Sequence, residues 1–200
     1  MAIVNGYATL VEIKAAMTSG MGTTQDTVIE RVVTAVSREI DRHCRRRFYG
    51  VSETRYYTPV DYAKLDIDDV GTSGSITLKT DEDGDRTYET TWASTDYDLW
   101  PYNAAPYMEI HVTPQGDNAW PVKVAKSVEL AAIFGYQSGT SADAPADVRE
   151  ACIIQSTRIF HRKDNPYGVA GNAEMGQLIQ IATLDPDVKL LLENYIRRAG

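Results

Sequence analysis

The chain is poor in cysteine and has no long apolar run. Its 200 residues contain two cysteines, Cys44 and Cys152, and no CxxC pair. Two distant cysteines fit a reducing cytoplasm, with both thiols half-buried, better than they fit a disulfide framework. No apolar stretch approaches the ~20 residues that a membrane-spanning helix needs. The first residues, MAIVNGYATL, also lack the basic segment and apolar core of a signal peptide. We therefore expect no membrane association and no signal peptide.

Positively charged residues are fewer than negatively charged ones, and the imbalance lies in the middle of the chain. The chain has 20 Lys and Arg against 28 Asp and Glu, a formal net charge of -8. Residues 61–145 hold 5 of these cations and 15 of the carboxylates, whereas residues 1–60 hold 8 and 6. An acidic surface of this kind repels nucleic acid over roughly a Debye length, ~10 Å at moderate salt. The balance argues against a general DNA-binding protein.

Helical patterns occupy both ends of the chain. Thr9 and Glu12 have the spacing of a capping box, which predicts a short helix over residues 9–17. An apolar stripe at helical spacing predicts a longer helix from about Gln25 to Arg47. A third helix is predicted to begin at Pro145 and a fourth at Asp185-Pro186, where Pro and an N-cap residue stand together.

The middle of the chain is instead typical of strands. Tyr, Thr, Val and Ile are frequent there, between turn residues such as Asp83-Gly84, and predict about six antiparallel strands. They fall in TRYYT, KLDID, SITLK, RTYETTW, YMEIHV and VKVAKSVELAAIFGY. The predicted fold class is α+β: a small helical bundle from residues 1–52 and 136–200, with residues 53–135 inserted as an acidic antiparallel β domain, whether sheet, sandwich or barrel.

No motif for catalysis or cofactor binding is present. His43-Cys44, Cys152 and His161 do not have the short paired spacing of zinc ligands. The stretch TDEDGDRTYE contains carboxylates but has its glycine at the wrong offset for a calcium-binding loop, so an exposed hairpin turn is favoured. Neither GxSxG nor a phosphate-binding glycine loop with lysine occurs. We expect no enzyme activity, no cofactor and no bound metal.

A cluster of arginines stands out against the acidic background. RHCRRRFYG, residues 42–50, places four arginines at the end of the predicted long helix. Cations favour a helix C-terminus by about 0.3–1 kcal/mol each, which explains one or two of them. If the helix continues to Arg47, the side chains fan around its last turn. Arg45, Arg46 and Arg47 are therefore predicted to contact protein carboxylates, in the same chain or across a subunit interface; phosphate binding is the competing hypothesis.

A glycine-rich loop near the C-terminal end is a second interface candidate. NPYGVAGNAEMG, residues 165–176, carries apolar side chains on a backbone too flexible to be held by local structure alone. Loops of this kind often become ordered against a partner. Pro166, Tyr167, Val169 and Met175 are the candidate contact residues, and a mobile surface loop is the alternative.

Several of these segments, taken in order, resemble one family. DYDLWPYNAAPYMEIHV, WPVKV, IFGY, PADVREA, NPYGVAG and LDPDVKLLLENYIRR, together with REIDRHCRRRF, are similar to the longer head–tail connector proteins of tailed bacteriophages. These are also called head-completion or adaptor proteins. The matching segments extend over nearly the whole chain, and the DYxLxPxNA and NPYGVxG…DPDV elements together are the most specific.

The resemblance implies a structural protein of the virion, made in the host bacterial cytoplasm. Its members form a homo-oligomeric ring, commonly dodecameric, beneath the portal protein at the head–tail junction. The ring extends the DNA channel and docks the next tail protein, while DNA passes through without specific binding. Longer members carry a β-rich insertion between their helices. The alternative function is a β-domain module for protein binding or regulation that forms no ring; a hydrolase or metalloenzyme is a distant third.

Overall fold

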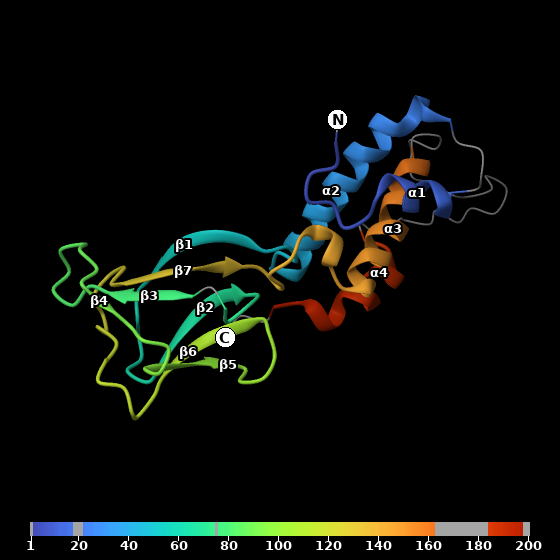
Figure 1. Cartoon of the computed structure of the whole chain (residues 1–200). Coiled ribbons are helices and arrows are strands. Elements are labelled where there is room, and N and C mark those ends of the chain that lie inside the picture. Colours follow the sequence, from blue (N-terminus) through green and yellow to red (C-terminus); the bar gives the residue numbers. More distant parts are fainter. Residues whose placement is uncertain (1, 18–21, 75, 163–183, 198–200) are drawn as a thin grey trace. The chain divides into compact units, whose positions relative to one another are not determined.

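The chain forms two compact units. The computed structural model describes residues 2–17, 22–74, 76–162 and 184–197. Met1–Arg46 and Ala144–Gly200 form the helical unit, and Arg47–Asp143 form the β unit. The α+β class, with helices and an antiparallel sheet, is confirmed (Figure 1). The boundaries of the two units lie at 46/47 and 143/144, whereas the sequence predicted 52/53 and 135/136.

The first helix begins as the capping pattern predicted. α1 spans Leu10–Ala16, and the Thr9 hydroxyl accepts a hydrogen bond from the backbone N–H of Glu12 at 3.2 Å. The Glu12 carboxylate in turn accepts one from the Thr9 N–H at 2.8 Å. Two N–H groups that would otherwise lack a partner at the start of the helix are thereby satisfied. The capping box is confirmed.

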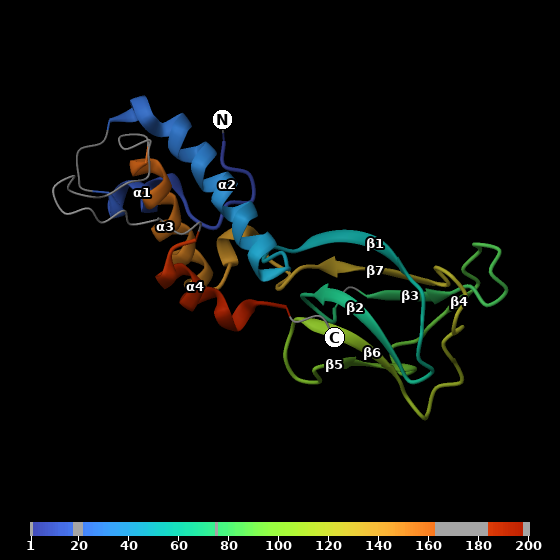
Figure 2. The ribbon, with the colours of Figure 1, turned by 180° about the vertical axis from the view of Figure 1, so that it is seen from behind.

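α3 lies at the centre of the helical unit. α2 spans Asp26–Cys44, α3 Ala146–His161 and α4 Pro186–Leu192, with a short 3₁₀ turn at each of Thr23–Gln25 and Glu193–Tyr195. α3 contacts α1, α2 and α4, and the three lie around it in both views (Figures 1 and 2). The shared core consists of buried aliphatic, cysteine and aromatic side chains: Ile13, Ile29, Val33, Val36, Ile40, Cys44, Val148, Ala151, Cys152, Phe160, Val188 and Leu192. None of the helices in the described ranges is long and apolar enough to cross a membrane.

The β unit is built on one curled antiparallel sheet. Its strands are β1 Val51–Tyr57, β2 Lys64–Val70, β3 Thr77–Thr80, β4 Thr90–Thr91, β5 Tyr97–Trp100, β6 Tyr107–Val112 and β7 Val128–Phe134. The order is β4-β3-β7-β2-β6-β5, and β1 pairs with the other edge of β7 (Figure 2). β7 is the central strand, because β1 pairs along all of it while β3 and β2 share its opposite edge.

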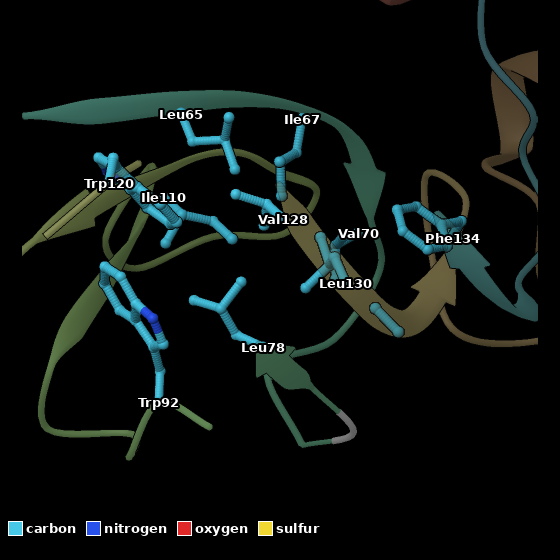
Figure 3. Packing of buried hydrophobic residues seen from close by; sticks show 11 residues of the cluster. Leu65, Ile67, Val70, Leu78, Trp92, Ile110, Trp120, Val128, Leu130 and Phe134 are labelled. Carbon is cyan, nitrogen blue, oxygen red and sulfur yellow. The ribbon is translucent and has the colours of Figure 1, made fainter. Parts of the chain in front are cut away.

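The core of the β unit lies on the concave side of this sheet. Alternate residues of β7 are buried, and they meet apolar side chains from β2, β3 and β6 (Figure 3). The cluster comprises Leu65, Ile67, Val70, Leu78, Trp92, Ile110, Trp120, Val128, Leu130, Ala132 and Phe134. The Trp92 and Trp120 rings stack with centroids 4.4 Å apart, and Trp92 Nε1 donates to Thr80 Oγ1 at 3.0 Å. These two large rings close one end of the core.

Two predicted strands differ from the structure, and one strand was not predicted. RTYETTW contains only β4 as strand, and the last predicted strand begins at Val128 rather than at Val122. Arg86, Lys123 and Lys126 have positive φ angles, which a continuous strand does not accommodate. The sequence analysis also missed β5, a four-residue strand that ends next to Pro101. Such a short strand carries too little alternation to be recognised.

Candidate functional site

The arginine cluster lies at a sharp turn and not on a continuous helix. α2 ends at Cys44, three residues before the predicted end, because Arg45 adopts a left-handed conformation with φ 54°. The backbone N–H groups of Arg45 and Arg46 both donate to the Asp41 carbonyl, the latter at 3.2 Å. This is a Schellman-type helix end, which usually has glycine at the left-handed position. The prediction that the arginines fan around one helical turn is therefore wrong.

Arg47 belongs to the β unit and is held there by three contacts. Its Nη1 donates to Glu53 Oε1 at 3.0 Å, and its Nη2 donates to the Phe134 carbonyl at 3.0 Å. The guanidinium also lies 5.2 Å from the centroid of the Tyr49 ring. The hydrogen bond from Arg47 is the main cause that holds the pKa of the Glu53 carboxyl below its ordinary value. Arg47 therefore contacts a protein carboxylate within its own chain.

This ion pair continues into a network along β1 and β2. Arg55 Nη2 donates to Glu53 Oε2 at 2.7 Å, and its Nη1 lies 2.7 Å from Asp68 Oδ2. The Tyr57 hydroxyl donates to the same Asp68 oxygen at 3.1 Å. The Arg55 guanidinium stands 4.3 Å from the centroid of the Phe134 ring, so it covers the edge of the buried cluster.

The sequence analysis did not predict this network. Its one available signal was that Glu53, Arg55 and Tyr57 alternate, which places their side chains on one face of a strand. The partner Asp68 lies on β2, inside the stretch from Asp66 to Val70 where the register of β2 against β6 is irregular. No pattern in the sequence reveals that irregularity, so the pairing could not be inferred.

The other two arginines differ from Arg47. Arg45 is exposed and makes no ion pair with the residues that the structure describes. Arg46 is half-buried in the helical unit. Their contact with another subunit stays a prediction. The second interface candidate, with Pro166, Tyr167, Val169 and Met175, lies outside the described residues.

The two thiols are structural. Burial raises the pKa of Cys44 to about 12, and burial also raises the pKa of Cys152. Cys152 Sγ lies 3.6 Å from Ser37 Oγ in the helical core. A thiol that stays protonated at neutral pH is a poor nucleophile and a poor metal ligand. Both side chains act as small buried hydrophobic groups.

The carboxylates of TDEDGDRTYE mainly organise their own turn. Asp81, Asp83 and Asp85 have carboxylate oxygens within 4.8 Å of one another. Asp81, which is buried, accepts hydrogen bonds from the N–H groups of Gly84 at 2.7 Å and Arg86 at 2.9 Å. Asp83 and Asp85 each accept one from a backbone N–H two residues later. These bonds are those of a side-chain-stabilised loop.

The whole chain is similar to chains of gene transfer agent (GTA) particles. No family model and no curated protein matches the sequence. Among solved structures, it matches a chain in "Neck of empty GTA particle computed with C6 symmetry", with a TM-score of 0.62 and 13% identity, over 100% of this chain and 95% of that one. This chain therefore shares its fold with that chain of the GTA neck.

Two further solved structures give the same result. One is "Virion of native gene transfer agent (GTA) particle", with a TM-score of 0.55, and the other "Neck of native GTA particle computed with C12 symmetry", with 0.54. Each is 16% identical to this chain and is matched over 100% of this chain and 95% of its own. The likeness therefore includes both the helical and the β unit.

Proposed function

We propose that the protein is a structural component of the neck of a tailed bacteriophage or phage-like particle, where it serves as a head–tail connector. The observation that carries this proposal is the likeness over the full chain to neck chains of gene transfer agent particles. An unrelated β module with added helices would match over one unit only. The order of helices, strands and helices, and the resemblance of the sequence to connector proteins, support the same function.

The connector acts as a ring of identical copies, twelve in the complete neck, beneath the portal protein. The C6 and C12 symmetries named for the similar structures support such an arrangement. The ring extends the DNA channel and docks the next tail protein. Its β unit, an insertion in the helical unit, contains 7 Lys and Arg against 16 Asp and Glu. An excess of carboxylates suits a channel through which DNA slides. Each contact between a cation of the channel and a DNA phosphate would add affinity for DNA and oppose its passage.

The role is mechanical and needs no catalytic site. The similar chains are parts of particle necks, and both thiols of this chain are buried, which raises the pKa of each. We therefore propose a protein without enzyme activity, cofactor or resident metal.

Removal of the protein from particle-producing cells tests the proposal. We expect heads and tails to accumulate separately, because the junction between them would be incomplete. Electron microscopy would distinguish separate heads and tails from joined particles. Immunogold labelling of complete particles should place the protein at the neck. Normally joined particles without the protein, or a 22.2 kDa monomer that never enters particles, would instead favour the β-domain binding module.

Arg45 provides a sharper test of the subunit interface. We expect Arg45→Gly to weaken ring association and to make its salt dependence shallower, because a charge pair between subunits would be lost. Glycine adopts the left-handed conformation readily, so the helix end should stay intact. Sedimentation velocity over a range of salt concentrations measures the effect.

Arg47→Ala is the matched control for that test. It removes an arginine two positions away, but one that pairs with Glu53 in its own unit. We expect it to lower the free energy of unfolding by about 1 kcal/mol or less and to leave association unchanged. Equal association of Arg45→Gly and wild type would refute the interface role. If the protein instead binds duplex DNA in a salt-sensitive way and Arg45→Gly abolishes that binding, the arginine cluster binds phosphate groups.

A further inference from the structure

The cations of the β unit that lack carboxylate partners are gathered in one place. Four of its seven cations form ion pairs: Arg47, Arg55, Lys64 and Lys79. The other three, Arg86, Lys123 and Lys126, form none with the β unit, of which the structure describes every residue but Ser75. In a unit with 16 carboxylates, three exposed cations without a carboxylate partner are unexpected. Two of them, Arg86 and Lys126, line the same hollow.

That hollow is shallow and has aromatic walls. Tyr56, Arg86, Tyr88 and Lys126 line a volume of about 320 Å³. The two tyrosine rings have centroids 5.6 Å apart and planes inclined by 32°. Tyr56 is 49% exposed, although large apolar rings are usually better covered. The site therefore offers ring faces and positive charge side by side.

The walls are held in position by hydrogen bonds to the chain at residues 125–126. The Tyr88 hydroxyl donates to the Lys126 carbonyl at 2.8 Å, and Arg86 Nη1 donates to the carbonyls of Ala125 and Lys126. The Lys126 N–H donates to Thr58 Oγ1 at 2.8 Å. Arg86 thus has a structural task, whereas the Lys126 ammonium group makes no hydrogen bond or ion pair with the described residues.

We propose that this hollow binds a carboxylate side chain from an extended acidic segment of a partner protein. Lys126 and the outer edge of the Arg86 guanidinium would pair with the carboxylate, and the tyrosine rings would cover its methylene groups. Tyr56 lies on β1, which pairs only with β7 among the described strands. The open edge of β1 can add main-chain hydrogen bonds to such a segment.

A peptide carboxylate suits this surface better than a nucleic acid does. Duplex DNA carries one negative charge per ~1.7 Å and would meet the repulsion of the whole acidic unit. A segment with one or two carboxylates carries little charge, and its electrostatic interactions are largely screened beyond about a Debye length. It therefore interacts mainly with Arg86 and Lys126 and less with the rest of the acidic unit. The inference concerns the β unit alone and does not depend on the proposed role in a particle neck.

Titration of the intact protein with a defined peptide tests the proposal. The probe is the peptide Gly-Glu-Tyr-Glu-Gly, with Gly-Gln-Tyr-Gln-Gly as its neutral counterpart, followed by amide chemical shifts in NMR spectra. We expect saturable shifts at Tyr56, Tyr88 and Lys126 with the acidic peptide only. Lys126→Gln should weaken its binding about tenfold, equivalent to the loss of one good charge pair.

Lys123→Gln is the matched control, because Lys123 is also exposed and unpaired but does not line the hollow. It should leave binding unchanged. Arg86→Lys is less informative, since it also changes the support of residues 125–126. Three results would overturn the proposal: equal losses in Lys126→Gln and Lys123→Gln, equal binding of the neutral peptide, or no shifts in the hollow. If a short DNA duplex binds more strongly than the acidic peptide, and this binding depends on Lys126, the hollow binds phosphate groups instead.

Discussion

Gly135→Ala is expected to destabilise the β unit by about 3 kcal/mol or more, one of the largest effects of a single methyl group in this chain. Gly135 has a φ of +147°, which an L-residue with a side chain rarely adopts. A Cβ there would lie 2.2 Å from the Tyr49 carbonyl oxygen, which belongs to the backbone and cannot rotate away. The Gly135 N–H also donates to the Asp69 carbonyl at 2.8 Å, so a local shift would break a further bond.

Chemical denaturation followed by tryptophan fluorescence measures this effect. Gly74→Ala is the matched control in the same unit, because its added Cβ would meet only the Thr72 hydroxyl at an ordinary 3.6 Å. We expect that variant to stay within about 0.5 kcal/mol of wild type. A Gly135→Ala protein as stable as Gly74→Ala would show that the path of the chain at Tyr49 is not as described.

Ile40→Ala and Leu130→Ala should each cost about 2–5 kcal/mol, but in different units. Ile40 on α2 and Leu130 on β7 are both fully buried in separate cores. The three tryptophans, at positions 92, 100 and 120, all lie in the β unit, whereas α1 to α4 lie in the helical unit. Fluorescence therefore follows one unit and the helical circular dichroism signal the other.

We expect Leu130→Ala to shift the fluorescence transition and Ile40→Ala to shift the helical transition, each leaving the other largely unchanged. This follows if the two units unfold separately, as compact domains with their own cores generally can. Leu190→Ala, at a 70% exposed position of α4, serves as the control and should change neither transition by more than about 0.5 kcal/mol. If both core variants shift both transitions equally, the chain is one cooperative domain.

Local signals in the sequence predicted the helix starts well and one helix end poorly. Thr9 with Glu12, and Asp185 before Pro186, determine their helix starts through bonds within a few residues, and the structure has both. The end of α2 depends on a left-handed residue, a position usually taken by glycine or asparagine. Arg45 occupies it here, so no residue at this point indicated that the helix ends at Cys44.

The candidate sites were predictable only where neighbours in the sequence decide them. Arg45, Arg46 and Arg47 were all expected to meet protein carboxylates. Arg47 does so within its own chain, and its partner Glu53 lies six positions away. The extension to Asp68 and the hollow around Lys126 depend on strand pairing and on positive φ angles. Long-range register of this kind is set by the complete sheet, and a linear pattern does not contain it.

Both ends of the β unit are tied to each other. The Tyr136 N–H donates to the Arg47 carbonyl at 2.7 Å, and the Gly50 N–H donates to the Gly139 carbonyl at 2.8 Å. A segment that enters and leaves at neighbouring points can be inserted into a host protein, or deleted from it, with little change to the host. The β unit thus has the form of an exchangeable cassette. Related proteins could acquire, lose or replace it in a single genetic event while the helical unit stays the same.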